Sequence, residues 1–266
     1  MISVALTIAG SDPSGGAGLQ ADLKTFHQHG VYGESVVTLL TVQNTRGVSE
    51  VQTLEPRFVL AQLDAVLSDI PPVAAKTGAL GSAALIEAIG ARAADFGFPL
   101  VVDPVMISKH GAPLMEPEAA AVLRRKLLPH ALLVTPNMPE AAALAEMEVA
   151  DLPAMERAAA AIALCGVPNV LVKGGRLEGV TVDVLYAEGD IHRFAAPRID
   201  TSHTHGTGCV FSAAITARLA RGEDLPSAVQ AAKAFVTHAI RTSPELGGGR
   251  GPTNMLAEGA DGSQKA

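Results

Sequence analysis

Short runs of Val, Ile and Leu alternate along this chain with longer segments whose apolar residues recur at helical spacing. Continuous apolar runs are typical of strands buried on both faces, and their alternation with helices predicts a mostly parallel sheet covered by helices. We therefore predict an α/β fold whose last two strands pair as a hairpin. The predicted strands span residues 3–9, 35–42, 48–54, 73–76, 100–103, 131–135, 169–173, 181–186 and 191–194.

The helical segments carry an apolar stripe, as in the first, where Leu19, Leu23 and Phe26 fall on one face. The chain has 266 residues, 48% of them apolar, and can bury roughly 70 to 75% of its unfolded surface as one domain. We assign this domain to residues 1–252 and expect a disordered tail over 253–266. The predicted helices span residues 18–29, 56–68, 82–96, 116–127, 139–147, 152–165, 208–221 and 225–242.

Composition excludes several classes of function. The net charge is −7, and the chain has seven Phe, two Tyr and no Trp, so nucleic acid is not an expected partner. The longest uncharged apolar stretch, 158–172, is interrupted by Gly166 and Pro168, so we expect no membrane span. The amino terminus lacks a signal-peptide pattern, which favours a cytoplasmic location. Two cysteines, Cys165 and Cys209, are too few for a disulfide framework.

A glycine-rich loop at residues 10–18 follows the first predicted strand. Gly16, Gly18 and Ala21 formally match the fingerprint of dinucleotide-binding proteins. The loop is too long for that turn, however, and Gln43 stands near the end of the second strand, where an acidic residue would bind the ribose. The chain also lacks the Gly-Lys-Ser/Thr triplet of a Walker A loop. A nucleotide would therefore be held in another way.

The strongest functional signal is a second glycine-rich loop, residues 201–209, which leads into an apolar helix. Gly206 and Gly208 allow the backbone to approach an anion closely, and the helix start adds positive potential, so this loop suits a transferring phosphoryl group. Cys209 would lie beside that group, and a helix start favours a thiolate, which could make it a base or a nucleophile. A loop whose glycines merely permit a turn is the alternative.

Two predicted strands end in a charged residue, Asp103 and Lys173. Because burying an unpaired charge is costly, we expect these side chains to face a ligand or each other, with an internal ion pair as the structural alternative. Asp103 suits Mg²⁺ or phosphate-bound water. Lys173, which is followed by two glycines, suits a phosphate approached by bare backbone.

Asn137 and Glu140 stand where another buried strand gives way to a helix. Their spacing predicts a capping box, in which each side chain accepts a backbone N–H of the other residue. Glu140 could in addition help to hold Mg²⁺ through water, and both interpretations can hold together. His203 and His205 lack an evident third ligand nearby, so we do not expect them to bind a metal ion.

In chain order, these motifs closely resemble those of the hydroxymethylpyrimidine/phosphomethylpyrimidine kinases of thiamine biosynthesis, in the ribokinase-like superfamily. The resemblance implies a three-layer α/β/α sandwich with a mostly parallel central sheet, usually a homodimer. It also implies two successive ATP-dependent phosphorylations of a small-molecule substrate, which need Mg²⁺. The motifs that carry it lie at residues 6–26, 42–45, 103–106, 135–141, 172–175 and 204–209.

The resemblance also implies roles for individual residues. A primary amide donates and accepts in one plane, so Gln43 would bind the aminopyrimidine edge. The other residues of that pocket would be Asp22, the Gly10 backbone, Val105, Met106 and Ala79. ATP would be bound by Lys173, Asn137, Thr135 and Thr207, and Mg²⁺ by Asp103 and Glu140 through water. Phosphoryl transfer would take place among Cys209, Gly206, Gly208 and Lys173.

Two positions depart from the family pattern. Ala79 replaces a pocket-side Met, and the smaller wall could admit a bulkier pyridine ring. In the flap-like segment 107–112, His110 stands where Ser is usual, and with Lys109 it could steer a phosphorylated acceptor. A pyridoxal-type kinase on the same fold is therefore an alternative function. A non-catalytic protein that binds a vitamin precursor is a third, which the intact set of charged residues argues against.

Overall fold

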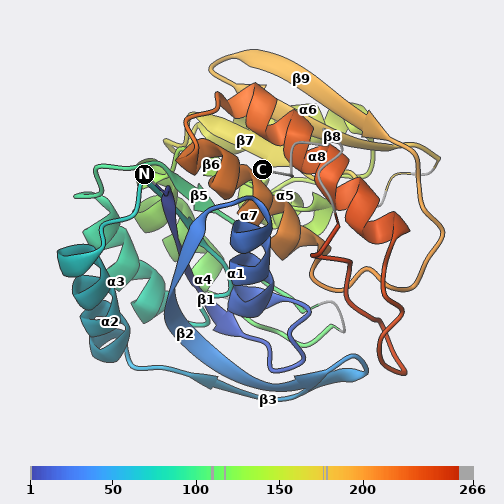
Figure 1. Ribbon diagram of the computed structural model, residues 1–266. Coiled ribbons are helices and arrows are strands. Elements are labelled where there is room, and N and C mark those ends of the chain that lie inside the picture. Colours follow the sequence, from blue (N-terminus) through green and yellow to red (C-terminus); the bar gives the residue numbers. More distant parts are fainter. Residues whose placement is uncertain (1, 109–110, 117, 176, 178, 258–266) are drawn as a thin grey trace.

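A computed structural model of the chain describes residues 2–108, 111–116, 118–175, 177 and 179–257 (Figure 1). All nine strands of this described part belong to one sheet, in the order β3-β2-β1-β4-β5-β6-β7-β8-β9. The strands are β1 (Val4–Ser11), β2 (Tyr32–Asn44), β3 (Gly47–Thr53), β4 (Ala74–Thr77), β5 (Leu100–Val102), β6 (Leu133–Val134), β7 (Asn169–Val172), β8 (Thr181–Ala187) and β9 (Asp190–Ala196).

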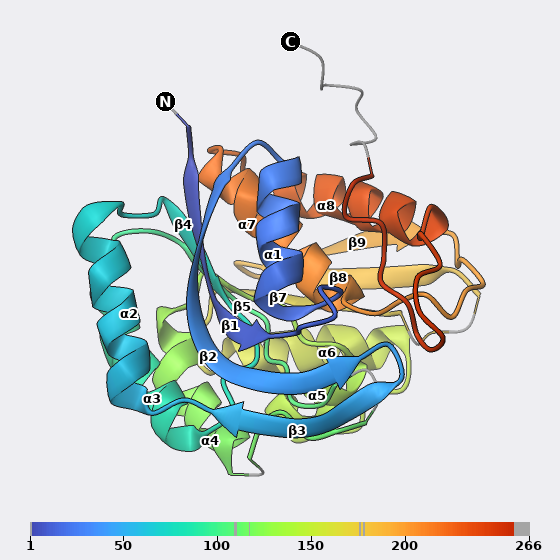
Figure 2. The same ribbon diagram turned by 60° about the horizontal axis from the view of Figure 1, so that its bottom comes forward.

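The centre of the sheet, from β2 through β7, is parallel, which confirms the prediction of a mostly parallel sheet. The predicted hairpin of β8 and β9 is also present, and β8 runs antiparallel to β7. At the other edge, β3 runs antiparallel to β2. With 13 residues against the 8 of β1, β2 outruns its neighbour, so the β2–β3 ribbon extends beyond the rest of the sheet (Figure 2).

Helices cover both faces of the sheet, as the expected three-layer sandwich requires (Figure 2). On one face lie α1 (Gly18–Gln28), α7 (Thr207–Ala220) and α8 (Leu225–Arg241). On the other face lie α2 (Pro56–Asp69), α3 (Ala83–Ala93), α4 (Ala119–Val122), α5 (Met138–Ala145) and α6 (Leu152–Ala163). Among the described residues, no helix is both long and apolar enough to traverse a bilayer.

Each parallel strand contributes side chains to the cores on both faces of the sheet, because successive side chains point to opposite faces. In β5, Val101 packs beneath α7 and α8, whereas Val102 packs against the helices of the opposite layer. Leu133 and Val134 divide in the same way in β6. This two-sided burial explains why the strands appear in the sequence as continuous apolar runs.

The structure corrects two predictions about single segments in part. The helix predicted over 116–127 begins at Ala119 as α4, widens into a π-helical turn, η1 (Leu123–Leu127), and ends in a 3₁₀ turn, η2 (Leu128–His130). The first five residues of the predicted disordered tail, 253–257, are packed. Met255 and Ala257 are 5% and 3% exposed in the core beneath α8, because apolar side chains gain free energy when they leave water.

The sheet topology fixes where a ligand can bind. From β1 the chain moves to β2 on one side, and β4 then pairs with β1 on the other side. Such a switch in strand order leaves a crevice at the carboxyl ends of the strands, where α/β proteins bind ligands. The loops after β1, β4, β5, β6 and β7 meet at this edge, and they contain most of the residues singled out above.

Candidate active site

The two glycine-rich loops touch each other at the switch point. Gly206 has φ +74°, and a Cβ there would lie 1.8 Å from the carbonyl oxygen of Gly16. A Cβ on Gly16 would in turn lie 2.6 Å from Cδ2 of His205. Both positions therefore require glycine, and the contact places the loop after β1 against the start of α7.

The start of α7 has the chemistry expected of a phosphate-binding site. The first N–H groups of a helix have no partner within it and carry partial positive charge. A Cβ on Gly208 would lie 3.3 Å from Nζ of Lys173, so the ammonium group lies directly beside the first turn. Backbone N–H groups and a fixed cation together form a site suited to a polyanionic phosphate.

Asp103 and Lys173 face each other, as one of the two interpretations expected. Lys173 Nζ donates to Asp103 Oδ1 at 2.9 Å, and their side chains are 15% and 2% exposed respectively. Thr135 and Ser212 also donate to the Asp103 carboxylate, each at 3.3 Å. Burial raises the pKa of Asp103, but Lys173 and Lys76 outweigh it and hold that pKa below its usual value. Asp103 is therefore an anion at neutral pH.

Asn137 and Glu140 form the predicted capping box at the start of α5. The Asn137 side chain accepts the Glu140 N–H at 3.0 Å, and Glu140 Oε2 accepts the Asn137 N–H at 2.8 Å. Burial and the nearby Asp103 raise the pKa of Glu140 to about 7, although Lys173 acts in the opposite direction. Two carboxylates and one ammonium group thus lie together below the glycine loop.

Cys209 lies in the first turn of α7, but its environment disfavours the thiolate. Burial, together with the negative charges of Asp22 and Asp103, raises the pKa of the thiol to about 12, even though Lys76 lowers it. The effect of the helix start is therefore outweighed. At neutral pH Cys209 is a neutral thiol, which does not fit the expectation that it acts as an activated base or nucleophile.

Asp22 does not lie open to a ligand, contrary to the expected contact with the ring. Its carboxylate is fully buried and accepts from Thr7 Oγ1 at 2.6 Å and from Lys76 Nζ at 2.8 Å. It faces inward because Asp22 follows Leu19 by one helical turn on the buried side of α1. Burial lowers the pKa of Lys76, but Asp22 outweighs it and the net shift is upward, which favours the ammonium form. Burial also raises the pKa of Asp22 above its usual value, because Lys76 and Thr7 offset only part of the cost of burying the carboxyl group.

The expected pyrimidine pocket lies at the ends of β1, β2 and β4. A Cβ on Gly10 would lie 3.6 Å from Cβ of Ala79, so these two residues share one wall. The backbone of Ala79 is fixed by Thr38, whose hydroxyl donates to the Ala79 carbonyl at 2.6 Å. Val105 and Met106 are half-buried in the segment that follows β5. The structure thus brings these residues to one edge of the sheet.

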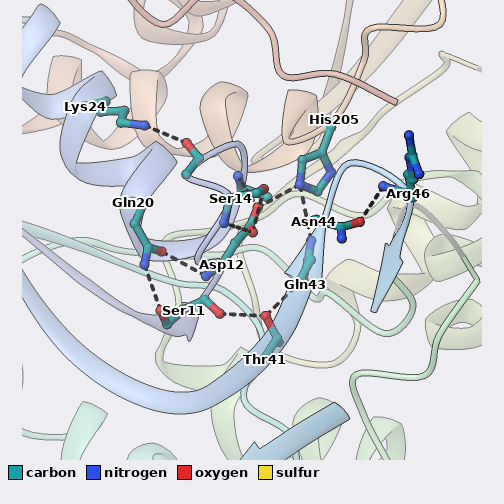
Figure 3. A network of polar contacts seen from close by, with 12 residues as sticks. Ser11, Asp12, Ser14, Gln20, Lys24, Thr41, Gln43, Asn44, Arg46 and His205 are labelled. Atoms are coloured by element: carbon teal, nitrogen blue, oxygen red, sulfur yellow. Dashed lines mark hydrogen bonds and ion pairs between the residues drawn. The ribbon is translucent and has the colours of Figure 1, made fainter. Parts of the chain in front are cut away.

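Gln43, at the end of β2, belongs to a polar network that connects both glycine-rich loops (Figure 3). Its amide lies 3.2 Å from His205 Nε2 and 3.2 Å from Thr41 Oγ1. His205 Nε2 also lies 2.7 Å from Asp12 Oδ2, and both side chains are buried. Asp12 and His205 are therefore site residues that sequence reasoning missed, although both stand within motifs it had singled out.

The side chains expected to bind ATP are partly engaged within the protein. Thr207 Oγ1 donates to the Thr204 carbonyl at 2.8 Å, and Thr135 and Asn137 make the contacts given above. Of the flap-like segment, the described part forms an antiparallel bridge between Ile107 and Pro113. Lys109 and His110, to which a role in steering the acceptor was assigned, lie outside the described residues.

Sequence reasoning left further buried polar residues without a role: Lys76, Ser212, Asp183 and Lys233. A charge within the apolar run of β4 could have pointed to Lys76, by the argument used for Asp103 and Lys173. Lys233 of α8 donates to Asp183 Oδ2 at 2.7 Å, and Asp183 Oδ1 accepts the Gly174 N–H at 2.9 Å. This pair fixes the loop directly after Lys173.

The fold and this arrangement of glycine loops and charges define a kinase of the ribokinase-like class, which uses ATP to phosphorylate a small molecule. The sequence pattern of the phosphomethylpyrimidine kinases matches residues 12–254. The chain belongs to that family, as the motifs had predicted.

Curated relatives agree with this assignment. The hydroxymethylpyrimidine/phosphomethylpyrimidine kinase of Haemophilus influenzae is 47% identical over 95% of this chain and 96% of its own length. The thiamine biosynthesis bifunctional protein ThiED of Geobacter sulfurreducens is 49% identical over 96% of this chain. The chain spans about half the length of that protein, 53%.

Solved structures with the same fold include both vitamin-kinase types. An ADP complex of the Bacillus subtilis pyridoxal kinase matches with a TM-score of 0.89 and 39% identity, covering 97% of this chain and 98% of that one. The phosphomethylpyrimidine kinase of Clostridium difficile matches with a TM-score of 0.79 and 42% identity, covering 90% and 99% respectively.

Proposed function

We propose that the protein phosphorylates 4-amino-5-hydroxymethyl-2-methylpyrimidine with ATP, first to the monophosphate and then to the diphosphate. The observation that carries this proposal is the contact between the two glycine-rich loops. It holds an amide suited to an aminopyrimidine, Gln43, and a phosphate-binding helix start, Gly206 to Cys209, on either side of one crevice. The names of the family and of the closely similar kinases support the same substrate.

In the proposed reaction, the acceptor oxygen forms a bond to the γ-phosphorus of ATP while the bond to the β,γ-bridging oxygen breaks. The transition state of such transfers is loose, so positioning and neutralisation of charge dominate the rate enhancement. Lys173 and the first N–H groups of α7 stabilise the equatorial phosphoryl oxygens. Cys209, as a neutral thiol, positions the acceptor hydroxyl rather than removing its proton. The hydroxyl loses that proton late, when the new bond has formed, and the proton passes to an oxygen of the transferred phosphoryl group or to solvent water.

Asp103 and Glu140 fit the Mg²⁺ ion that kinases of this kind need. Mg²⁺ takes oxygen ligands and is commonly held by one or two carboxylates together with substrate phosphates and water. The two carboxylates are close enough for the charge of Asp103 to raise the pKa of Glu140, and a cation there would relieve this repulsion. Bound Mg²⁺ would neutralise charge on the phosphates. Among the described residues no group of three or more His, Cys, Asp or Glu gathers at one point, so phosphates and water would complete the shell.

A pyridoxal-type kinase is the second candidate function, and Ala79 favours it. Its small side chain forms one wall with Gly10, which leaves more room for a ring than a Met would. Pyridoxal kinases are also among the structures with high TM-scores. The two functions differ in the acceptor ring alone, so they share the same transfer machinery.

We also propose that residues 1–252, together with the packed residues 253–257, act as one kinase domain in a cytoplasmic homodimer, with small molecules as the other partners. Exposed apolar side chains on the β2–β3 ribbon support a contact between two copies, since Leu40, Val42 and Val51 are 44%, 56% and 37% exposed. Sedimentation analysis tests this assembly, and a single monomeric species at micromolar concentration would contradict it.

The experiment for the substrate incubates the purified protein with Mg-ATP and either the pyrimidine alcohol or pyridoxal, and follows the products by mass. We expect both pyrimidine phosphates to appear in sequence. The variant Ala79→Met serves as the matched comparison, because it narrows the shared wall and should disfavour pyridoxal more than the pyrimidine. Faster phosphorylation of pyridoxal by the unmodified protein would favour the second function, and turnover of neither substrate would contradict both.

A further inference from the structure

Asp12 is the fixed end of the network in Figure 3. Its Oδ1 accepts from the Ser14 N–H at 2.9 Å and the Ser14 hydroxyl at 2.7 Å, and its Oδ2 accepts the Ala17 N–H at 2.9 Å. Burial raises the pKa of Asp12, but the hydrogen bonds from His205 and Ser14 outweigh it and the net shift is downward. Asp12 is thus an anion that can only accept.

The proton of His205 follows from this. Nε2 of the imidazole lies 2.7 Å from Asp12 Oδ2, which is a short contact for two heavy atoms that must share a proton. Because the carboxylate supplies no proton, Nε2 carries one. That single proton points toward Asp12, and a protonated ring nitrogen has no in-plane lone pair left. Toward the Gln43 amide, 3.2 Å away, Nε2 can therefore share its proton but cannot accept one.

Thr41 determines which atom of the Gln43 amide lies at the end that faces away from His205. Its hydroxyl has one proton, and the Ser11 carbonyl, a pure acceptor, lies 2.9 Å away, closer than the Gln43 amide at 3.2 Å. The proton therefore belongs to the contact with Ser11, and toward Gln43 the Thr41 oxygen accepts.

These two ends decide which atom of the amide is which. The nitrogen and oxygen of a glutamine amide are assigned from their hydrogen-bond partners. With the amide nitrogen beside His205, two donors would face each other. With the amide oxygen beside Thr41, two acceptors would face each other. Rotation of the amide by 180° satisfies both contacts, with the oxygen toward His205 and the nitrogen toward Thr41.

We propose that Asp12, His205 and Thr41 are positioning residues that fix the Gln43 amide in this orientation and thereby set the direction in which an aminopyrimidine is bound. The inference rests on the proposed function. The two protein contacts use one N–H and one lone pair of the amide, and one of each is left for the ring. The positions of this remaining N–H and lone pair are fixed. An aminopyrimidine edge carries an acceptor nitrogen beside an amino donor, so it can pair with them in only one direction.

The fixed direction matters for the reaction because the hydroxymethyl group is attached next to the amino group of the ring. Binding the edge in one direction brings that group toward the start of α7, and the reverse direction turns it away. The same imidazole packs on Gly16, next to the carbonyl that Gly206 approaches. Asp12 and His205 thus couple the orientation of the ring to the position of the phosphoryl-binding loop.

The test compares two substrates with opposite edges. The 4-oxo analogue has a carbonyl acceptor in place of the amino group and a protonated ring nitrogen, so its donor and acceptor are exchanged. We expect the wild type to prefer the amino compound in kcat/KM, and Asp12→Asn and His205→Phe to reduce that preference by about tenfold or more. The KM for ATP should stay within about twofold, and His205→Gln, which restores a donor, should recover part of the preference.

Lys24→Ala is the matched control, because Lys24 donates to the Gly15 carbonyl of the same loop at 2.7 Å but has no part in the orientation of the amide. It should keep the wild-type preference. A preference unchanged in both Asp12→Asn and His205→Phe would overturn the proposal. If these variants do not fold, ¹⁵N NMR of the wild-type imidazole decides, since a proton is expected on Nε2 between pH 6 and 8 and its absence there would overturn it. A wild type that turns over neither compound would instead contradict the proposed function.

Discussion

At the scale of single residues, the crevice contains charges of alternating sign. Lys76 pairs with Asp22, and Lys173 pairs with Asp103 and influences Glu140. Buried ion pairs seldom add net stability, because removing both charges from water offsets their attraction. For the Asp103–Lys173 pair we propose a functional value: it keeps an ammonium group beside the start of α7, where phosphate charge would be neutralised.

Glu140 gives the stability of the metal-free protein a distinct pH dependence. Its pKa of about 7 in the folded state lies above its ordinary value of 4.5, so the folded state retains a proton that the unfolded state loses. Stability therefore falls as pH rises from about 4.5 to about 7 and then levels off. Glu140→Gln removes this dependence and can still cap the helix. Between about pH 4.5 and 7, we expect the free energy of unfolding of the variant to rise by about 3 kcal/mol relative to that of the wild type. Urea unfolding with chelator present measures this difference. A difference that does not change with pH would contradict the assignment.

Cys209 should contribute no ionisation to the rate profile at working pH. Because the pKa of its thiol is raised to about 12, the thiol stays protonated throughout the range in which the enzyme can be assayed. We expect Cys209→Ser, which keeps a hydrogen-bonding group, to retain more of kcat than Cys209→Ala, with profiles of the same shape between pH 7 and 9. A rise in wild-type kcat over that range that is lost in both variants would point to a thiolate instead.

At the scale of elements, the loops matter more than the helices they join. Strand ends supply the charged side chains, while α5 and α7 supply their first turns. The one backbone position at which this assembly is most sensitive is Gly206, which combines φ +74° with a Cβ position 1.8 Å from another backbone oxygen.

Gly206 would suffer both backbone strain and a steric clash if it were replaced. A parallel replacement of Gly222, which follows the same helix, separates the two effects. Gly222 has φ +84° but no heavy atom within 4 Å of its Cβ position. Gly222→Ala should lower the free energy of unfolding by about 1 to 2 kcal/mol, through backbone strain alone. Gly206→Ala should cost more and lower kcat/KM by roughly a hundredfold, because the glycine loops must separate. Equal effects of the two substitutions on stability and activity would show that the contact between the loops is unimportant.

At the scale of the whole molecule, segments far apart in sequence close the site. The residues around 247–253 reach the β2–β3 turn, where the Arg250 N–H donates to the Thr45 carbonyl at 2.7 Å, and they pair with His205 through Pro252. The chain then continues beneath α8, where the Asn254 N–H donates to the Ala239 carbonyl at 2.9 Å. The carboxyl-terminal segment is therefore part of the folded unit.

Met255 and its neighbour Leu256 test this directly. Met255 is 5% exposed and Leu256 is 78% exposed. Met255→Ala should lower the free energy of unfolding by about 2 to 3 kcal/mol, because it removes buried apolar atoms and leaves a cavity. Leu256→Ala should change it by less than about 0.5 kcal/mol. Thermal and urea unfolding measure both values, and similar losses would contradict the packing described for 253–257.

The sequence predicted the layers well because the signal for buried strands is local. Each predicted strand overlaps an observed one, since Val, Ile and Leu runs directly reflect burial on both faces. The capping box of Asn137 and Glu140 was equally readable, because it depends on residues three positions apart. The π-helical turn within the predicted helix 116–127 was not predicted, because it coincides with a packing contact in which the Lys126 carbonyl lies against Gly90 of α3.

What the sequence could not predict depends on distant partners. The thiolate considered at Cys209 is disfavoured first by burial and then by Asp22 and Asp103, which lie more than a hundred positions earlier in the chain. Asp22 of α1 is buried together with a partner from β4, because Lys76 donates to its carboxylate at 2.8 Å. His205 was judged on the absence of a third metal ligand, whereas its partner is a carboxylate in the loop after β1. Spacing alone does not contain these contacts.

The contact between Asp12 and His205 joins residues 193 positions apart, and that between Gln43 and His205 joins residues 162 apart. The chain must therefore leave the ribosome at least as far as His205 before this network can form. Contacts of such long range form slowly, because the intervening chain must first be ordered. Until His205 emerges during synthesis, Asp12 and Gln43 lack the side chain that connects them, so the crevice of the growing chain is incomplete.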